Sequence, residues 1–342
     1  MAKNSEKRAQ SRKERLAARA EAERIAAEQA KRERTIQTTI GVAVVVVLVA
    51  VIGIVGYFVG RNMWESSVPT SQRADSLYSK VEAVKNKPKN ATKDGGFLLS
   101  AKGLNKQISN VPTIDEYMDF ICPACGTMNR TTHATIESMV SAGQVNFVAH
   151  PAAFLNASST DRYSTRSAAF VAYVLDNEPD KGMALIAKLF STDTQPGEAS
   201  AYKSVSNTDL IKIAQSVGVS DKVAQAAAQG KYEKWIDAIS AWDPYREELW
   251  NVTGSYKGTM TTPTILINKN YWDYNTLTAK YNTDYVSLLL ESIGLTKADV
   301  GNSSAKPSIG NGTPRDISND ATSKSSGSQS ESDSEDATTS SR

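Results

Sequence analysis

Residues 111–125 read VPTIDEYMDFICPAC and contain both cysteines of the chain. Residues 111–120 are typical of a β-strand, with several β-branched and aromatic positions. After Cys125 a mainly helical pattern continues to about residue 142. The sequence therefore predicts that Cys122 and Cys125 lie where a strand passes into a helix.

A helix start is a place where a cysteine becomes reactive. Unpaired backbone N–H groups and the helix dipole stabilise negative charge there, and Pro123 suits the first turn because its missing N–H costs nothing. Cys122 is therefore the expected thiolate, and Cys125, one turn later, can reach its sulfur. Lowering a cysteine pKa from about 8.5 to ~6 stabilises the reduced form by about 1.4 kcal/mol at pH 7, roughly 30 mV towards oxidising. This favours a disulfide donor.

A Cys-x-x-Cys pair can also bind a metal, but this needs further ligand side chains, of which the chain has few. Two cysteines and two histidines, His133 and His150, are too few ligands for a convincing zinc site. We therefore expect no metal and no other cofactor, with His133 on the surface and His150 at the end of a strand. Two alternatives stay open. One is an inert disulfide, although a bridge that closes so short a loop constrains the unfolded chain little. The other is a pair of buried free thiols.

A second motif lies about 140 residues downstream. Residues 260–264 read MTTPT and lead into TILIN, residues 264–268, a strand rich in β-branched residues. With the cysteine pair, this motif resembles the DsbA-like branch of the thioredoxin superfamily. The resemblance implies that Thr262 and Pro263 form a cis-proline loop that faces the cysteines and presents backbone to the substrate. An ordinary trans X-Pro strand start is the alternative, because only about 5–6% of X-Pro bonds are cis.

The resemblance also points to an acid. Glu116 lies six residues before Cys122 and matches a buried carboxylate that relays a proton to Cys125 in that family. Because side chains alternate along a strand, Asp115 on the opposite face is the rival, and a solvent-facing Glu116 stays open. The residues between the cysteines are Pro-Ala rather than the Pro-His of strong oxidants in that family. The resemblance therefore does not imply the oxidising strength that this histidine contributes.

The remaining pattern alternates strands and helices. Residues 145–149 form a second short apolar run, residues 165–250 follow a helical pattern, and residues 283–293 form a last helix. Breaks in the helical region are expected at Pro179, Gln195-Pro196-Gly197, Gly218 and Gly230. This order predicts an α/β fold, thioredoxin-like with a helical insertion, over residues 95–298.

The start of the chain predicts a membrane anchor. Residues 1–34 carry eleven Lys or Arg and six Glu, whereas residues 35–60 carry no charge. A helix over residues 40–60 would rise about 31 Å, enough to cross a hydrocarbon core. The basic excess before this transmembrane helix predicts a cytoplasmic N-terminus and an extracytoplasmic remainder. A cleaved signal peptide, whose apolar region is normally shorter, is the alternative.

Two polar segments flank the predicted domain. Residues 61–94 are expected to form an extracytoplasmic stalk, partly helical around residues 76–84. Residues 299–342 are rich in Ser and Asp and have few large apolar side chains, so we expect a disordered tail.

The function predicted from these features is a membrane-tethered thiol–disulfide oxidoreductase that donates disulfides to exported proteins. Its expected partners are exported proteins with cysteine thiols, a membrane redox partner that reoxidises it, and the lipid bilayer around the anchor. A net charge of +2 gives no sign of nucleic-acid binding. Two alternatives stay open. One is a reductase or isomerase of the same fold, because the direction of exchange depends on the reduction potential and the partner. The other is a redox-inactive peptide-binding module.

Overall fold

The computed structural model describes residues 69–315. The predicted basic segment, residues 1–34, the transmembrane helix, residues 35–60, and the end of the predicted tail lie outside the described residues. Within residues 69–315, every helix is too short or too polar to span a bilayer.

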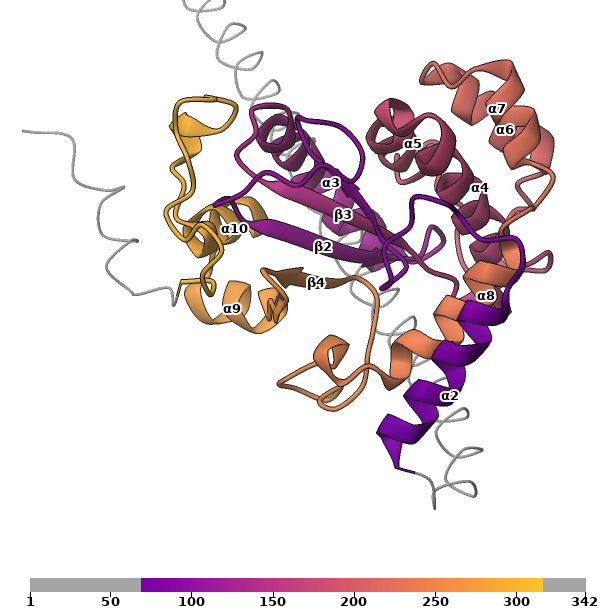
Figure 1. Ribbon diagram of the computed structural model, residues 1–342, viewed down its shortest axis with the longest axis horizontal. Helices are drawn as coiled ribbons and strands as arrows, with labels where there is room; N and C mark the ends of the chain where they lie inside the picture. The colour runs from indigo at the N-terminus through magenta and orange to yellow at the C-terminus, as the bar shows by residue number, and fades with distance from the viewer. Residues whose placement is uncertain (1–68, 316–342) are drawn as a thin grey trace, which may run out of the picture. The chain divides into compact units, whose positions relative to one another are not determined.

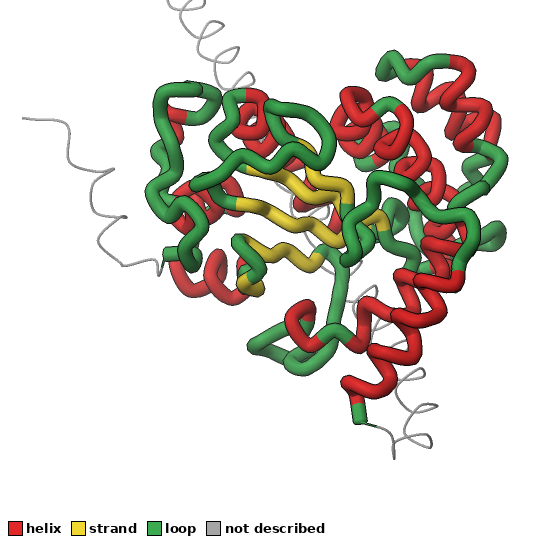
Figure 2. Tube along the Cα trace, in the orientation of Figure 1, coloured by secondary structure: helices red, strands yellow, loops and turns green. Residues whose placement is uncertain are grey.

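A five-stranded mixed sheet forms the centre of the described part (Figures 1 and 2). Its strand order is β1-β3-β2-β4-β5, with β2 parallel to β3 and the other neighbouring pairs antiparallel. The strands are β1 (Phe97–Leu99), β2 (Thr113–Met118), β3 (Asn146–Pro151), β4 (Thr264–Ile267) and β5 (Asn270–Tyr271). All six residues of β3 and all four of β4 are buried, in keeping with the apolar residues that make up most of both strands.

Helices connect and surround these strands. The α-helices are α2 (Thr70–Ala83), α3 (Pro123–Ser141), α4 (Tyr163–Asn177), α5 (Gly182–Leu189), α6 (Asn207–Ser216), α7 (Asp221–Ala227), α8 (Glu233–Trp242), α9 (Tyr274–Tyr281) and α10 (Tyr285–Ile293). Short 3-10 turns lie at Asn156–Ser158, Pro179–Lys181, Ala199–Ala201, Asp243–Tyr245, Glu247–Leu249 and Lys297–Asp299. Helix α3 joins the parallel strands β2 and β3 (Figure 1). Helices α4 to α8, which follow β3 and precede β4 along the chain, form a helical block. The predicted α/β fold with a helical insertion is confirmed.

The predicted breaks in the helical block separate its helices. Helix α4 ends before Pro179 and α5 ends before residues 195–197. Helices α6 and α7 are followed by Gly218 and Gly230, whose φ angles are 83° and 69°. Glycine adopts such positive φ angles easily because it has no Cβ atom. Helix α9 and the short strands β1 and β5 were not predicted.

The segment predicted as a stalk is part of the folded unit from Thr70 onward. Helix α2 packs along α8 (Figure 1), and the rings of Tyr78 and Trp242 lie 4.7 Å apart. Farther on, Asn90 Nδ2 donates to Asp176 Oδ1 at 3.0 Å. The domain boundary expected at residue 95 is therefore wrong, because polar and aromatic contacts fix the preceding residues to the helical block.

The predicted disordered tail also begins too early. The Gln144 amide donates to the carbonyl oxygens of Asp299, Asn302 and Ala305 and accepts from the backbone N–H of Gly301. Asn268 Nδ2 donates to two more carbonyls, at Gly310 and Gly312. Two side-chain amides thus bind the backbone of residues 299–312, a kind of anchoring that does not require the large apolar residues missing from this segment.

Candidate active site

The two cysteines lie at the start of α3, as the pattern indicated. Cys122 is the N-cap residue, with φ −66° and ψ 118°, and Pro123 occupies the first helical position. Cys122 is 6% exposed and Cys125 is fully buried. Both are free thiols here. The pair is therefore asymmetric, because the residue at the helix start keeps a small exposed fraction and the residue one turn later keeps none.

The surroundings of the pair separate the two thiol pKa values. A hydrogen bond from the Cys125 thiol is the largest cause of a lowered Cys122 pKa, and it outweighs burial with help from the Cys125 backbone N–H and the Thr262 side chain. Burial raises the pKa of Cys125 well above its ordinary value, and the neighbouring Cys122 raises it further. Of the two thiols, Cys122 therefore loses its proton more readily, and Cys125 keeps its proton to higher pH.

The loop before β4 lies against the cysteines. The Thr262–Pro263 peptide bond is cis, as the resemblance implied. The Thr262 carbonyl oxygen lies 3.4 Å from the Cys122 sulfur, so two residues 140 positions apart meet at one place. Tyr274, which sequence reasoning missed, is buried and donates its hydroxyl to the Pro263 carbonyl at 3.0 Å.

Glu116 is buried in β2, which excludes the solvent-facing alternative. Burial raises its pKa to about 7, and its Oε1 atom has no hydrogen-bond partner in the described part of the chain. A carboxyl group of this kind can exchange a proton near neutral pH. Burial alone accounts for the shift, without a charged partner.

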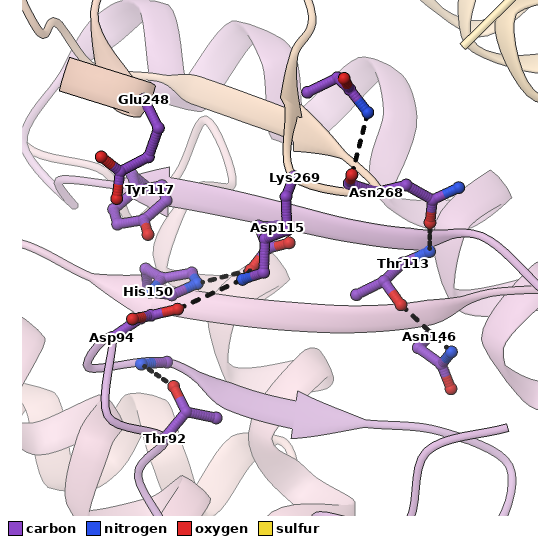
Figure 3. Close-up of polar contacts among 12 residues, drawn as sticks. Thr92, Asp94, Thr113, Asp115, Tyr117, Asn146, His150, Glu248, Asn268 and Lys269 are labelled. Carbon is purple, nitrogen blue, oxygen red and sulfur yellow. Dashed lines mark hydrogen bonds and ion pairs between the residues drawn. The ribbon is translucent and has the colours of Figure 1, made fainter. Parts of the chain in front are cut away.

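Asp115 belongs to a polar cluster on the other face of β2 (Figure 3). Its Oδ1 atom lies 3.0 Å from His150 Nε2 and 2.9 Å from Lys269 Nζ. Burial would raise the Asp115 pKa, but the His150 hydrogen bond and the Lys269 ammonium group outweigh it and lower that pKa. The His150 ring in turn stacks on Tyr117 at 3.9 Å. These contacts give Asp115 an ionised, structural role.

A second buried acid, Asp119, lies three residues before Cys122 and was not singled out from the sequence. Asp119 is buried and accepts hydrogen bonds from the backbone N–H groups of Ile121, Phe154 and Leu155. Burial raises its pKa to about 6 despite these bonds. Its charge raises the pKa of both cysteines. The negative charge of Asp119 therefore opposes thiolate formation, although at Cys125 a hydrogen bond with the Asp119 backbone acts in the opposite direction. No spacing rule pointed to Asp119.

His133 is also not where it was expected. It is 8% exposed on α3 and hydrogen-bonds with Asn129 at 3.2 Å. Burial lowers its pKa, so it is neutral inside the domain. His150 lies near the end of β3, close to its predicted place.

Known proteins resemble part of the chain. PknE, a serine/threonine-protein kinase of Mycobacterium tuberculosis, is 31% identical over 157 residues, which cover 45% of this chain and 26% of the kinase. The chain thus spans about a quarter of the length of that curated relative. Reduced DsbA of M. tuberculosis is 27% identical, with 54% of this chain and 90% of that one covered and a TM-score of 0.44. Reduced DsbG of M. tuberculosis is 26% identical, with 59% and 89% covered and a TM-score of 0.45.

A family model described as thioredoxin matches residues 109–282, just over half of the chain. The matched region begins before β2 and includes the cysteine pair, the helical block and the cis-proline loop. The chain therefore belongs to the thioredoxin family.

Proposed function

We propose that the protein is a membrane-tethered thiol–disulfide oxidoreductase that donates disulfides to exported proteins. The observation that carries this proposal is the asymmetric cysteine pair. Cys122 combines a lowered pKa with a 6% exposed fraction, while Cys125 is completely buried and has a raised pKa. A stabilised Cys122 thiolate makes the reduced enzyme the favoured product, so the oxidised enzyme tends to pass its disulfide on.

The proposed cycle balances without a bound cofactor. A substrate thiolate attacks the Cys122 sulfur of the oxidised pair, forming a mixed disulfide and releasing Cys125 as a thiolate, which takes up a proton. A second substrate thiolate then attacks the substrate sulfur of the mixed disulfide and releases Cys122 as a thiolate. Two substrate thiols are oxidised and one enzyme disulfide is reduced. A membrane redox partner takes the two electrons to restore the enzyme disulfide.

Two buried acids could supply the proton for Cys125. Glu116 carries the role implied by the family resemblance, and its pKa of about 7 leaves it protonated in part at neutral pH. Asp119 acts electrostatically on both cysteines, and its pKa is raised to about 6. The loop at Thr262 and Pro263 would hold the substrate backbone beside Cys122, given the 3.4 Å approach of the Thr262 carbonyl.

The direction of exchange is tested by the reduction potential. The full chain in detergent, equilibrated in glutathione buffers of graded potential, should be half reduced at about −120 to about −180 mV, the range of disulfide donors. The measurement is the fraction of alkylated thiols at each buffer potential. A midpoint near −270 mV, on the order of that of thioredoxin, would indicate a reductase instead. Failure to exchange at any potential would favour a redox-inactive binding module.

The membrane placement is a separate part of the proposal. The uncharged residues 35–60 and the basic excess in residues 1–34 support a cytoplasmic N-terminus. Protease added to intact cells or spheroplasts should therefore digest the protein after residue 60 and spare the first 34 residues. Lysed cells are the control, in which both regions should be cut. Protection of the cysteine domain in intact cells would reverse the assigned orientation.

A further inference from the structure

The side chain of Gln195, in the helical block, contacts the start of the active-site helix. Its Nε2 atom donates to the Cys122 carbonyl oxygen at 2.9 Å and approaches the Phe120 carbonyl oxygen at 3.4 Å. Its Oε1 atom accepts from Arg130 Nη1 at 2.9 Å. Arginine has only donors, so Arg130 determines which end of the amide faces Cys122. The N–H end therefore points at the backbone of the reactive cysteine.

A second contact holds this arrangement in place. Arg130 Nη1 also donates to the Phe190 carbonyl oxygen at 2.7 Å. The Phe190 ring stacks on Phe120, with centroids 5.0 Å apart. Phe190 and Gln195 thus contact Arg130 in α3, which follows Cys122, and Phe120, which precedes it. We call Arg130, Phe190 and Gln195 the clamp.

The glycine that follows the cysteine pair makes room for the clamp. A Cβ atom on Gly126 would lie 2.0 Å from Gln195 Oε1 and 2.6 Å from Arg130 Nη1. Gly126 lies inside α3, where glycine costs about 1 kcal/mol relative to alanine. A side chain at this position is incompatible with the observed place of Gln195. The space that the clamp occupies, and not the backbone conformation of Gly126, therefore explains the glycine at this position.

The contact to Cys122 has a chemical consequence. The Cys122 carbonyl oxygen already accepts the helical hydrogen bond from Gly126 N at 3.0 Å, so Gln195 is its second donor. A donor N–H at this oxygen offsets partial negative charge next to the sulfur and holds the N-cap geometry. We propose that Gln195 is a positioning residue for thiol–disulfide exchange, through which the helical block keeps Cys122 at the helix start with its thiolate favoured. This inference rests on the proposed function, in which Cys122 is the reacting sulfur.

The test measures the pH dependence of Cys122 alkylation in the reduced full chain, with iodoacetamide and mass spectrometry. In Gln195→Ala the alkylation rate at pH 6 should fall about threefold, since half a pKa unit is a threefold change in thiolate fraction. In Gln195→Glu the fall should be about tenfold, because a carboxylate cannot donate and adds negative charge. Gly126→Ala should push Gln195 aside and lower the rate in the same direction.

Gln215→Ala is the matched control, because Gln215 also makes a side-chain hydrogen bond within the helical block, to Asp221. Its alkylation profile should match that of the unchanged protein. The inference is overturned if the Gln195 variants lose thermal stability but keep the same profile, or if Gly126→Ala leaves it unmoved. Alkylation does not require a protein substrate, so failure of disulfide exchange in glutathione buffers would reject the proposed function without deciding this test.

Discussion

Replacing Cys125 by serine should make mixed disulfides between Cys122 and substrate proteins accumulate, whereas replacing Cys122 should abolish both activity and trapping. The reason is the unequal exposure of the two residues, since Cys122 is 6% exposed and Cys125 is fully buried. A thiol held one helical turn away acts at a very high effective concentration. Removing it should therefore raise the amount of trapped adduct by about tenfold or more.

Non-reducing electrophoresis of cell extracts, followed by mass spectrometry of the adducts, measures this division of roles. The variant without either cysteine is the control and should trap nothing. Adducts on Cys125 in the Cys122→Ser variant, with none on Cys122 in its counterpart, would show that the roles are reversed. Such a result would also require the fully buried sulfur to become accessible, which hydrogen exchange of α3 would reveal.

Signals carried by neighbouring residues predicted much of the fold. The cysteine pair with Pro123 indicated a strand-to-helix junction, and the structure has β2 and α3 on either side of it. Pro179, Gly218 and Gly230 indicated helix ends because they act on the local backbone. The family resemblance placed Thr262 and Pro263 opposite the pair, although 140 residues separate Thr262 from Cys122.

Features that depend on contacts between distant polar residues were not predictable in this way. The clamp joins Arg130 to Gln195, 65 residues away, through a single hydrogen bond. Gln144 binds residues 299–305 through hydrogen bonds to backbone carbonyls, which composition cannot indicate. Asp119 looks in sequence like a polar residue near a strand end, and its effect on the cysteines arises from the folded arrangement. Hydrophobic patterns do not record such interactions.

Replacing Glu116 by glutamine should change how stability depends on pH. The carboxyl pKa is raised from 4.5 to about 7 by burial, so the folded state favours the protonated form. The stability contributed by this protonation is fully present below pH 4.5 and is lost as pH rises through about 7. From the size of the shift, the loss at pH 8 is about 3 kcal/mol. Glutamine does not titrate, so the variant should lack this loss.

The quantity to measure is the difference in free energy of unfolding between Glu116→Gln and the unchanged protein, from urea titrations at several pH values. It should rise in favour of the variant by about 3 kcal/mol between pH 4 and pH 8, whatever its starting value at low pH. Because the buried aspartates Asp115, Asp119 and Asp243 titrate in both proteins, their contributions cancel. Glu247→Gln, at an exposed site, is the control for the exchange of glutamate for glutamine. A flat difference for Glu116→Gln would mean that Glu116 is ionised in the folded protein at neutral pH and holds no proton to give to Cys125.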